Sequence, residues 1–232
     1  MKKISVIIPV LNEQKTIQGL LEQLQSLSRQ GHEIIVIDGG SSDGTLAHLK
    51  SLPNRSDVPF YHNLLTAKPG RAQQMNLGAA NATGDLLWFL HADSIVSGTL
   101  IEQITQTSGL WGWCNVKLDG KSKSFRLIES MMNFRARLTR VATGDQGLYV
   151  DKNVFQKAGA YPDIALMEDV ALSKILKKIA KPVILNERLV SSSRRWEQGG
   201  IWRTVLLMWR LRWAYFWGKN PDALSSSYRE SR

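Results

Sequence analysis

Three acidic side chains stand at or just beyond the ends of apolar segments in this sequence. They are Glu13, Asp38 and Asp93, and the segments before the first two read ISVIIPV and EIIVID. Continuous apolar, β-branched runs of this kind are typical of strands buried on both faces of a parallel sheet. Since ligands bind beyond the carboxyl ends of such strands, we expect the three carboxyl groups to converge on one crevice.

Asp93 ends the segment His91-Ala92-Asp93, which follows the apolar run 85–90. A carboxylate in such a loop suits a hard divalent cation, Mg²⁺ or Mn²⁺. A cation there would bridge two phosphates and neutralise a leaving diphosphate. The alternative is that Asp93 caps a helix beginning near Ser97, and the residue types alone leave both interpretations open.

Two further positions favour a nucleotide. Asp38 precedes Gly39-Gly40, and its carboxylate could accept a hydrogen bond from the N–H of a uracil-type base, although Asp, Gly and Ser are also ordinary turn residues. Lys68 and Arg71 surround a predicted helix start, where they oppose the helix dipole but would bind an anion together with the free N–H groups. The glycine spacing of a dinucleotide fingerprint and a Walker loop are both missing.

Glu168 and Asp169 are adjacent acids at another predicted helix start. Acidic residues there stabilise the helix dipole. A carboxylate placed near an acceptor hydroxyl would equally act as a general base.

These residues must be positioned by alternating strands and helices. The apolar patterns predict strands at 4–8, 33–38, 59–65, 85–90, 110–118 and 182–186. They predict helices at 17–27, 46–52, 70–82, 124–140 and 168–180. The alternation indicates an α/β fold with a mostly parallel sheet and helices on both faces.

The composition limits the architecture and the partners. With 232 residues, of which 43% are apolar, we expect one domain over 1–200 and an appendage over 201–232. The formal charge of +10 favours anionic partners. The single cysteine, Cys114, excludes an intrachain disulfide and permits a cytoplasmic location. No run reaches the roughly 18 uncharged apolar residues of a membrane-spanning helix, and we interpret residues 1–13 as a strand rather than a signal peptide.

Taken in order, these segments resemble the family 2 glycosyltransferases of the GT-A fold. The stretches that carry the resemblance are VIIPVLNE (6–13), DGGSSDGT (38–45), GRA (70–72), ATGD (82–85) and HAD (91–93). It covers about residues 3–100 well and 140–195 more loosely. The stretches GRAQQMN, LHAD and SRRW are similar to those of a small bacterial subgroup of these transferases.

The resemblance implies a donor site, a metal site and an acceptor side. It places the nucleotide-sugar donor against Pro9, Leu11, Glu13, Asp38, Gly40 and Arg71, and a Mn²⁺ or Mg²⁺ ion at Asp93 and His91. His91 replaces the first acid of the family's Asp-x-Asp motif, so Asp93 is the stronger candidate ligand.

Asp169 matches the family's usual base, with Glu168 beside it. Asp145 and Gln146 lie where related enzymes build the acceptor side, although Gly-Asp is also a turn former. Arg195 and Trp196 resemble the Arg-Trp of a Gln-x-x-Arg-Trp motif found in processive members. Ser192 stands in place of its Gln, so polymer synthesis is not expected.

The segment 201–217 carries Trp202, Trp209, Trp213 and Trp217 on one helical face. Trp together with flanking Arg suits a membrane interface. We therefore predict a peripheral membrane helix that brings the site to a lipid-linked or membrane-proximal acceptor at the inner face of the cell membrane. A helix packed on the domain, or an oligomer contact, is the alternative.

These features together predict a metal-dependent, inverting transfer of a sugar from a nucleoside diphosphate sugar, preferably a UDP-sugar, to an acceptor hydroxyl. One rival is a nucleotidyltransferase, but Asn12-Glu13 is poor for binding a triphosphate after the first strand. The other is a non-catalytic basic module that binds membrane or nucleic acid. It leaves the acids at the strand ends unexplained, so we expect no nucleic acid partner.

Overall fold

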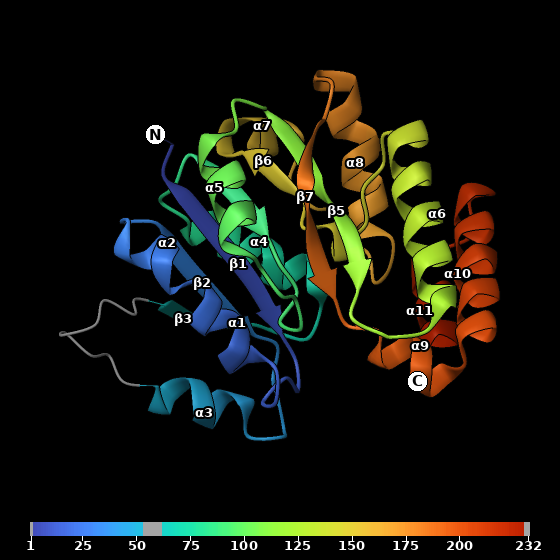
Figure 1. Cartoon of the computed structure of the whole chain (residues 1–232), viewed down its shortest axis with the longest axis horizontal. Coiled ribbons are helices and arrows are strands. Elements are labelled where there is room, and N and C mark those ends of the chain that lie inside the picture. The colour runs from blue at the N-terminus through green and yellow to red at the C-terminus, as the bar shows by residue number, and fades with distance from the viewer. Residues whose placement is uncertain (1, 53–61, 230–232) are drawn as a thin grey trace.

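A computed structural model describes residues 2–52 and 62–229, apart from the side chains of a few of them. Its described strands form one seven-stranded sheet in the order β3-β2-β1-β4-β6-β5-β7 (Figure 1). The strands are β1 (Ile4–Val10), β2 (Glu33–Asp38), β3 (His62–Thr66), β4 (Leu86–Phe89), β5 (Trp111–Leu118), β6 (Tyr149–Asp151) and β7 (Val183–Ser191). Only β6 runs antiparallel to its neighbours, which confirms the mostly parallel α/β fold.

The predicted strands match this sheet with three differences. The strand predicted at 59–65 is β3, and residues 59–61 lie outside the described part of the chain. β7 is longer than the predicted 182–186. β6 was not predicted, because three residues are too few to show a strand period.

Helices cover both faces of the sheet. They are α1 (Ile17–Gln23), α2 (Gln25–Arg29), α3 (Thr45–Ser51), α4 (Arg71–Asn81), α5 (Gly98–Gln106), α6 (Lys123–Thr139), α7 (Lys152–Lys157), α8 (Glu168–Ile179), α9 (Arg194–Gly199), α10 (Ile201–Phe216) and α11 (Pro221–Arg229), with a 3₁₀ turn η1 (Gly144–Gln146). The core between α1, α2, α5 and the sheet contains Leu20, Leu24 and Leu100. The core on the other face contains Met75 of α4, Phe155 of α7 and Leu172 of α8. The helix predicted over 17–27 is divided at Leu24.

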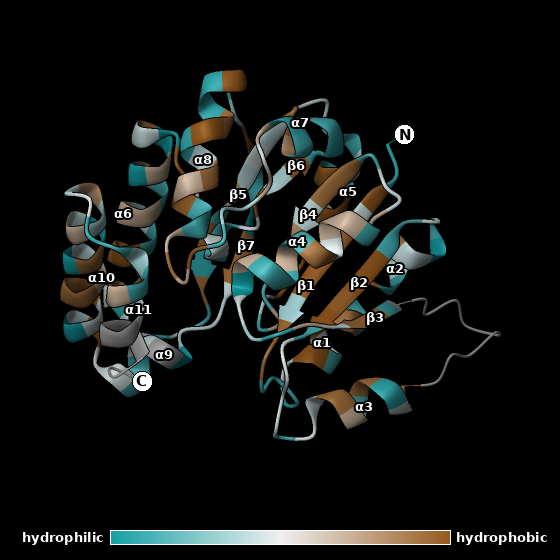
Figure 2. Cartoon of the chain, turned by 180° about the vertical axis from the view of Figure 1, so that it is seen from behind, coloured by the Kyte–Doolittle hydropathy of each residue, from teal (hydrophilic) through white to brown (hydrophobic). Residues whose placement is uncertain are grey.

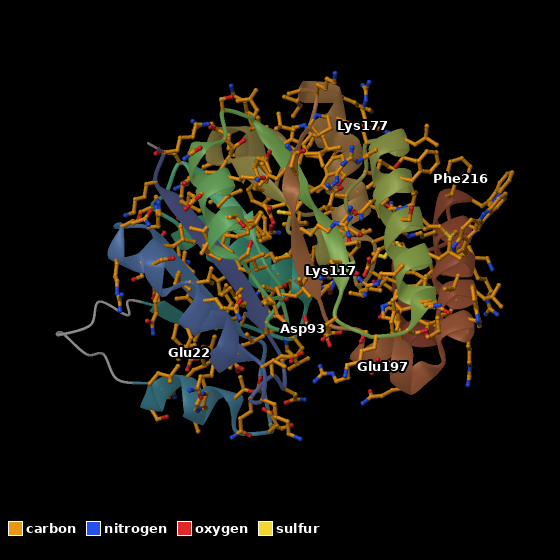
Figure 3. All side chains as sticks on the ribbon, viewed as in Figure 1. Glu22, Asp93, Lys117, Lys177, Glu197 and Phe216 are labelled. Carbon is orange, nitrogen blue, oxygen red and sulfur yellow. The ribbon has the colours of Figure 1, made fainter. Side chains whose placement is uncertain are left out.

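The parallel register places the predicted site loops at one edge of the sheet. Val10 pairs with Asp38, and Ile7 pairs with Phe89, so β1, β2 and β4 end side by side. The loops that carry Glu13 and Asp93 begin at this edge. Figure 3 shows Asp93 there, on the side of the sheet edge that faces α9.

α6, α10 and α11 form an outer layer beyond β5 and α8 (Figures 1 and 2). Phe125 and Ile128 of α6 pack with Ile201 and Val205 of α10. Leu211 of α10 belongs to a second small cluster that reaches the start of α8. In the described residues, we find no helix with the length and apolar content needed to cross a membrane.

Candidate active site

Hydrogen bonds between backbone N–H groups and side-chain oxygens tie the loop after β1 to the loop after β2. Asn12 adopts a left-handed conformation, and its Oδ1 accepts a hydrogen bond from the Ser42 N–H at 2.8 Å. The Asn12 N–H donates to Ser41 Oγ at 2.9 Å, and the Glu13 N–H donates to Thr45 Oγ1 at 2.9 Å. The two motifs at the ends of these strands therefore form one rigid unit around the carboxyl edge.

Asp38 is buried within this unit. Its Oδ2 accepts hydrogen bonds from the Gly40 N–H at 3.0 Å and the Ser41 N–H at 3.1 Å. Its Oδ1 is also buried but has no partner among the described residues. Turn formation accounts for one oxygen only, and a buried acceptor without a partner is unfavourable unless a ligand donates to it.

The other residues predicted to line the nucleotide side are less enclosed. Leu11 is exposed, and Pro9 is partly buried within β1. Glu13 accepts a hydrogen bond from Thr16 Oγ1 at 2.7 Å and forms a looser ion pair with Arg194 of α9, with 3.6 Å between Nη2 and Oε2. This ion pair brings the segment after β7 to the nucleotide side.

A small pocket lies beside the end of β4. Its polar lining comes from Arg71, His91, Gly144, Tyr161, Glu168 and Asp169. Four of the residues singled out from the sequence thus meet in one place, although they come from loops and helices up to 98 positions apart.

Arg71 is the cation at the centre of this pocket. Its Nη1 donates to Glu168 Oε1 at 3.1 Å, and its Nη2 lies 3.1 Å from His91 Nε2. Burial disfavours the charge of Arg71, but the carboxylates of Glu168, Asp169 and Asp145 outweigh it and raise the pKa of the guanidinium. Arg71 therefore stays fully charged.

The contacts of His91 determine its tautomer. A guanidinium only donates hydrogen bonds, so Nε2 must be the unprotonated nitrogen that accepts from Arg71. Nδ1 then carries the proton and faces Asp145 Oδ1 at 3.4 Å. Both ring nitrogens are engaged, so His91 would have to break a contact in order to bind a metal ion.

Glu168 and Asp169 occupy different environments at the start of α8. Glu168 is buried, and this burial together with the charge of Asp169 raises its pKa despite the opposing effect of Arg71. Asp169 is only partly buried, and its Oδ2 accepts from the Gly144 N–H at 2.7 Å. The preceding Met167 has a φ of +69°, a strained conformation of the kind found at functional sites.

Asp93 does not cap α5, because Ser97 Oγ accepts the capping hydrogen bond from the Leu100 N–H. Within residues 2–52 and 62–229, its carboxylate has no hydrogen-bond or ion-pair partner. No three His, Cys, Asp or Glu side chains of the described residues gather closely enough to hold a metal ion. A cation at Asp93 would therefore take most of its ligands from donor phosphates and water, as Mg²⁺ commonly does.

The predicted acceptor side is only partly open. Asp145 is 40% exposed, whereas Gln146 is fully buried and its Oε1 accepts from the Thr143 N–H at 3.1 Å. Gln146 therefore supports the η1 turn from inside, and its buried Nε2 has no hydrogen-bond partner among the described residues. Trp196 packs against the cluster between α6 and α10. The side chain of Arg195 lies outside the described residues.

Three residues that build the site were not singled out from the sequence. Gln74 Nε2 donates to the Val10 carbonyl at 2.9 Å and to the Ile37 carbonyl at 2.8 Å, which joins the ends of β1 and β2. Asn76 donates to the Tyr161 carbonyl at 2.8 Å and so fixes this ring in the pocket wall. The stretch GRAQQMN was a signal for the first two, because it supplies Arg71, Gln74 and Asn76 on one helix.

The N-terminal part of the chain is similar to proteins of known family. Residues 5–108 match Glycosyl transferase family 2. The matched residues belong to a family 2 glycosyltransferase domain. It is 35% identical over 95 residues to the undecaprenyl-phosphate 4-deoxy-4-formamido-L-arabinose transferase of Yersinia pestis, a match that covers 40% of this chain and 29% of that relative.

Solved structures show the same GT-A fold. The mannosyltransferase PcManGT from Pyrobaculum calidifontis, in complex with GDP-Man and Mn²⁺, aligns over 99% of this chain and 70% of its own, with a TM-score of 0.67 and 17% identity. S. aureus TarS 1–349 in complex with UDP aligns over 82% of this chain and 60% of its own, with a TM-score of 0.65 and 18% identity. At these identities the structures support the fold of the family 2 domain rather than its substrates.

Proposed function

We propose that the protein transfers a sugar from a nucleoside diphosphate sugar, preferably a UDP-sugar, to an acceptor hydroxyl with inversion at the anomeric carbon. The observation that carries the proposal is that charged Arg71 and partly buried Asp169 line the same pocket, which lies beside the strand-end loops. It provides an anion-binding group and a carboxylate base in one cleft. The neighbouring loops provide the buried acceptor of Asp38 for a base N–H.

The residues divide the reaction between them. Asp38 Oδ1 accepts from the nucleobase, and the remaining N–H groups of Arg71 donate to the donor diphosphate. Asp169 accepts the proton of the acceptor hydroxyl while that oxygen attacks the anomeric carbon and the bond to the diphosphate breaks. Each Asp169 oxygen has a second lone pair for this proton, because each accepts one backbone N–H.

A divalent cation, Mn²⁺ or Mg²⁺, would be held by Asp93 together with the donor phosphates. When bound it would neutralise charge on the departing diphosphate. His91 contacts Arg71 and Asp145 rather than the cation, and its contact with Arg71 orients the guanidinium toward the same phosphates.

A thermal-shift panel of UDP, GDP and UDP-sugars with and without Mn²⁺ tests the donor side. UDP with Mn²⁺ should stabilise the protein, and Asp38→Asn and Asp93→Asn should lose that shift. Asp169→Asn should keep the shift and lose transfer. Failure of every nucleoside diphosphate to bind, or full transfer by Asp169→Asn, would reject the proposal.

The acceptor is expected at a membrane surface. The stripe of Trp202, Trp209, Trp213 and Trp217 on α10 is exposed, and so is Phe216, which projects from the outer layer in Figure 3. The opposite side of α10 packs on the domain through Leu211 and other residues, so packing and an exposed aromatic face coexist.

α6 extends this apolar face. Its side chains Leu127, Met131, Phe134 and Leu138 are exposed at helical spacing, and α6 lies beside α10 in both cartoon views. Aromatic and aliphatic side chains flanked by Arg suit a bilayer interface. The Yersinia relative also carries a lipid phosphate in its name.

Flotation of the full chain with vesicles that contain phosphatidylglycerol tests this contact. Trp209→Ser combined with Trp213→Ser should reduce the bound fraction strongly. Ile179→Ser on α8 is the matched control, because it removes an exposed apolar side chain outside the outer layer. Equal flotation of all three proteins would reject the membrane contact.

A further inference from the structure

Two arginines lie in the outer layer near the start of α8. Arg135 lies on α6, and its Nη1 donates to the Val141 carbonyl at 3.2 Å. Its Nε and Nη2 are buried and have no hydrogen-bond partner, and Arg135 is the only cation of the described residues in this situation. Arg212 of α10, which is partly buried, forms no hydrogen bond or ion pair within the described part of the chain.

The two guanidinium groups are close enough to affect each other. Burial, together with the charge of Arg212, lowers the pKa of Arg135 to about 10. Burial also lowers the pKa of Arg212. Both groups remain charged at neutral pH, and buried like charges that repel each other are unfavourable unless an anion joins them.

The nearest negative groups are those of the proposed reaction. The carboxylates of Asp169 and Asp145 attract both arginines through space. Val141, which accepts from Arg135, packs in one cluster with Met167 and Leu211. This cluster adjoins the start of α8, so the arginine pair lies on the side of Asp169 that faces the outer layer.

A phosphate group fits these requirements. Its oxygens accept hydrogen bonds from the parallel N–H groups of a guanidinium, and its charge offsets that of two arginines. The position between Asp169 and the exposed face of α6 and α10 is where an acceptor would approach. The proposed function assigns the donor diphosphate to Arg71, which also pairs with Glu168, so the diphosphate and this second anion would be bound by different arginines.

We propose that Arg135 and Arg212 form a second anion site, which binds a phosphate group of the acceptor next to Asp169. The identification of that anion as part of the acceptor rests on the proposed function. The site itself rests on the unpaired buried donors of Arg135 and on the second arginine beside them.

The first experiment measures binding of inorganic phosphate by thermal shift, against sodium chloride of equal ionic strength. At about ten times its Kd, phosphate should raise the Tm of the wild type by roughly 3–5 °C. Arg135→Gln and Arg212→Gln should each weaken phosphate binding by about tenfold or more, because a charge-assisted hydrogen bond is lost. Arg210→Gln is the matched control, since it removes an exposed arginine from the same helix.

Arg71→Met separates the two anion sites, and it should keep the response to phosphate. UDP binding measured on the same variants keeps the two proposals distinguishable. Arg135→Gln and Arg212→Gln should bind UDP like the wild type, whereas absence of UDP binding by the wild type would reject the proposed function alone. Because Arg135→Gln alters a buried residue, the partly buried Arg212 provides the second, independent variant.

Vesicles of phosphatidylcholine distinguish the source of the phosphate. One set contains phosphatidic acid, which has a terminal phosphate, and the other contains phosphatidylglycerol at matched surface charge. A preference for phosphatidic acid that both variants lose indicates a lipid-borne phosphate. Phosphate binding without that preference indicates a water-soluble acceptor. An unchanged phosphate response in both variants would overturn the site.

Discussion

The ion pair between Arg71 and Glu168 should make a large and pH-dependent contribution to stability. Glu168 is buried and its partner is 39% exposed, with 3.1 Å between Nη1 and Oε1. Two unit charges about 4 Å apart interact by about 4 kcal/mol at an effective dielectric constant of 20. Solvent at the exposed Arg71 screens part of this, so we expect a coupling of about 2 kcal/mol.

Arg71→Met leaves Glu168 buried without a cation. The free energy of unfolding should fall by about 2 kcal/mol, which corresponds to a decrease in Tm of about 4–8 °C for a chain of this size. Glu168→Gln should lose less, because a neutral amide needs no counter-ion. In the double variant, Arg71→Met should cost almost nothing beyond Glu168→Gln, and Lys68→Met controls for the loss of an exposed charge nearby.

The pH dependence of the stability loss in Arg71→Met tests the ion pair most directly. Burial raises the folded-state pKa of Glu168 above its ordinary value of 4.5, so the folded protein binds this proton more tightly than the unfolded chain. Stability therefore falls as pH rises between the unfolded and the folded pKa. Removing Arg71 raises the folded pKa further, so the deficit of Arg71→Met should be largest at neutral pH and should shrink as the pH falls toward the ordinary Glu168 pKa of 4.5. Urea unfolding measures both effects, and additive single variants with a pH-independent deficit would refute the reasoning.

Three other substitutions or reactions follow from the packing of the site and core. Gly144→Ala places a Cβ 2.5 Å from His91 Nε2 and should reduce transfer by about tenfold or more. Gly98→Ala is the control, because its Cβ would enter open space and should leave transfer and stability unchanged. Equal activity of both variants would show that His91 can move freely. Gln74→Met removes two buried hydrogen bonds and should cost about 2 kcal/mol in urea unfolding, although the Val10 carbonyl keeps the Gly39 N–H as a donor. A loss below about 0.5 kcal/mol would contradict the bridging role. Burial raises the pKa of the Cys114 thiol, so iodoacetamide should label it only after unfolding, and rapid labelling of the native protein would disprove this.

Much of the fold could be read from local patterns. The strand 33–38 and the helix predicted at 70–82 match β2 and α4 closely, because apolar runs and helical spacing are properties of neighbouring residues. The strand-end position of Asp38 was predictable for the same reason. By contrast, the antiparallel β6 depends on its partners β4 and β5, and no feature within its three residues marks it as a strand.

The sequence by itself determined which residue types stand at the strand ends, and it supplied the helical stripes of α6 and α10. Only the tertiary structure decided that Arg71 meets Glu168, 97 positions away, and that Gln146 is fully buried. It also decided that the apolar stripe of α6 remains exposed and that Arg135 and Arg212 lie together. The physical reason is that residue spacing fixes the face of an element on which a side chain lies, whereas its partner is set by how distant elements pack against one another.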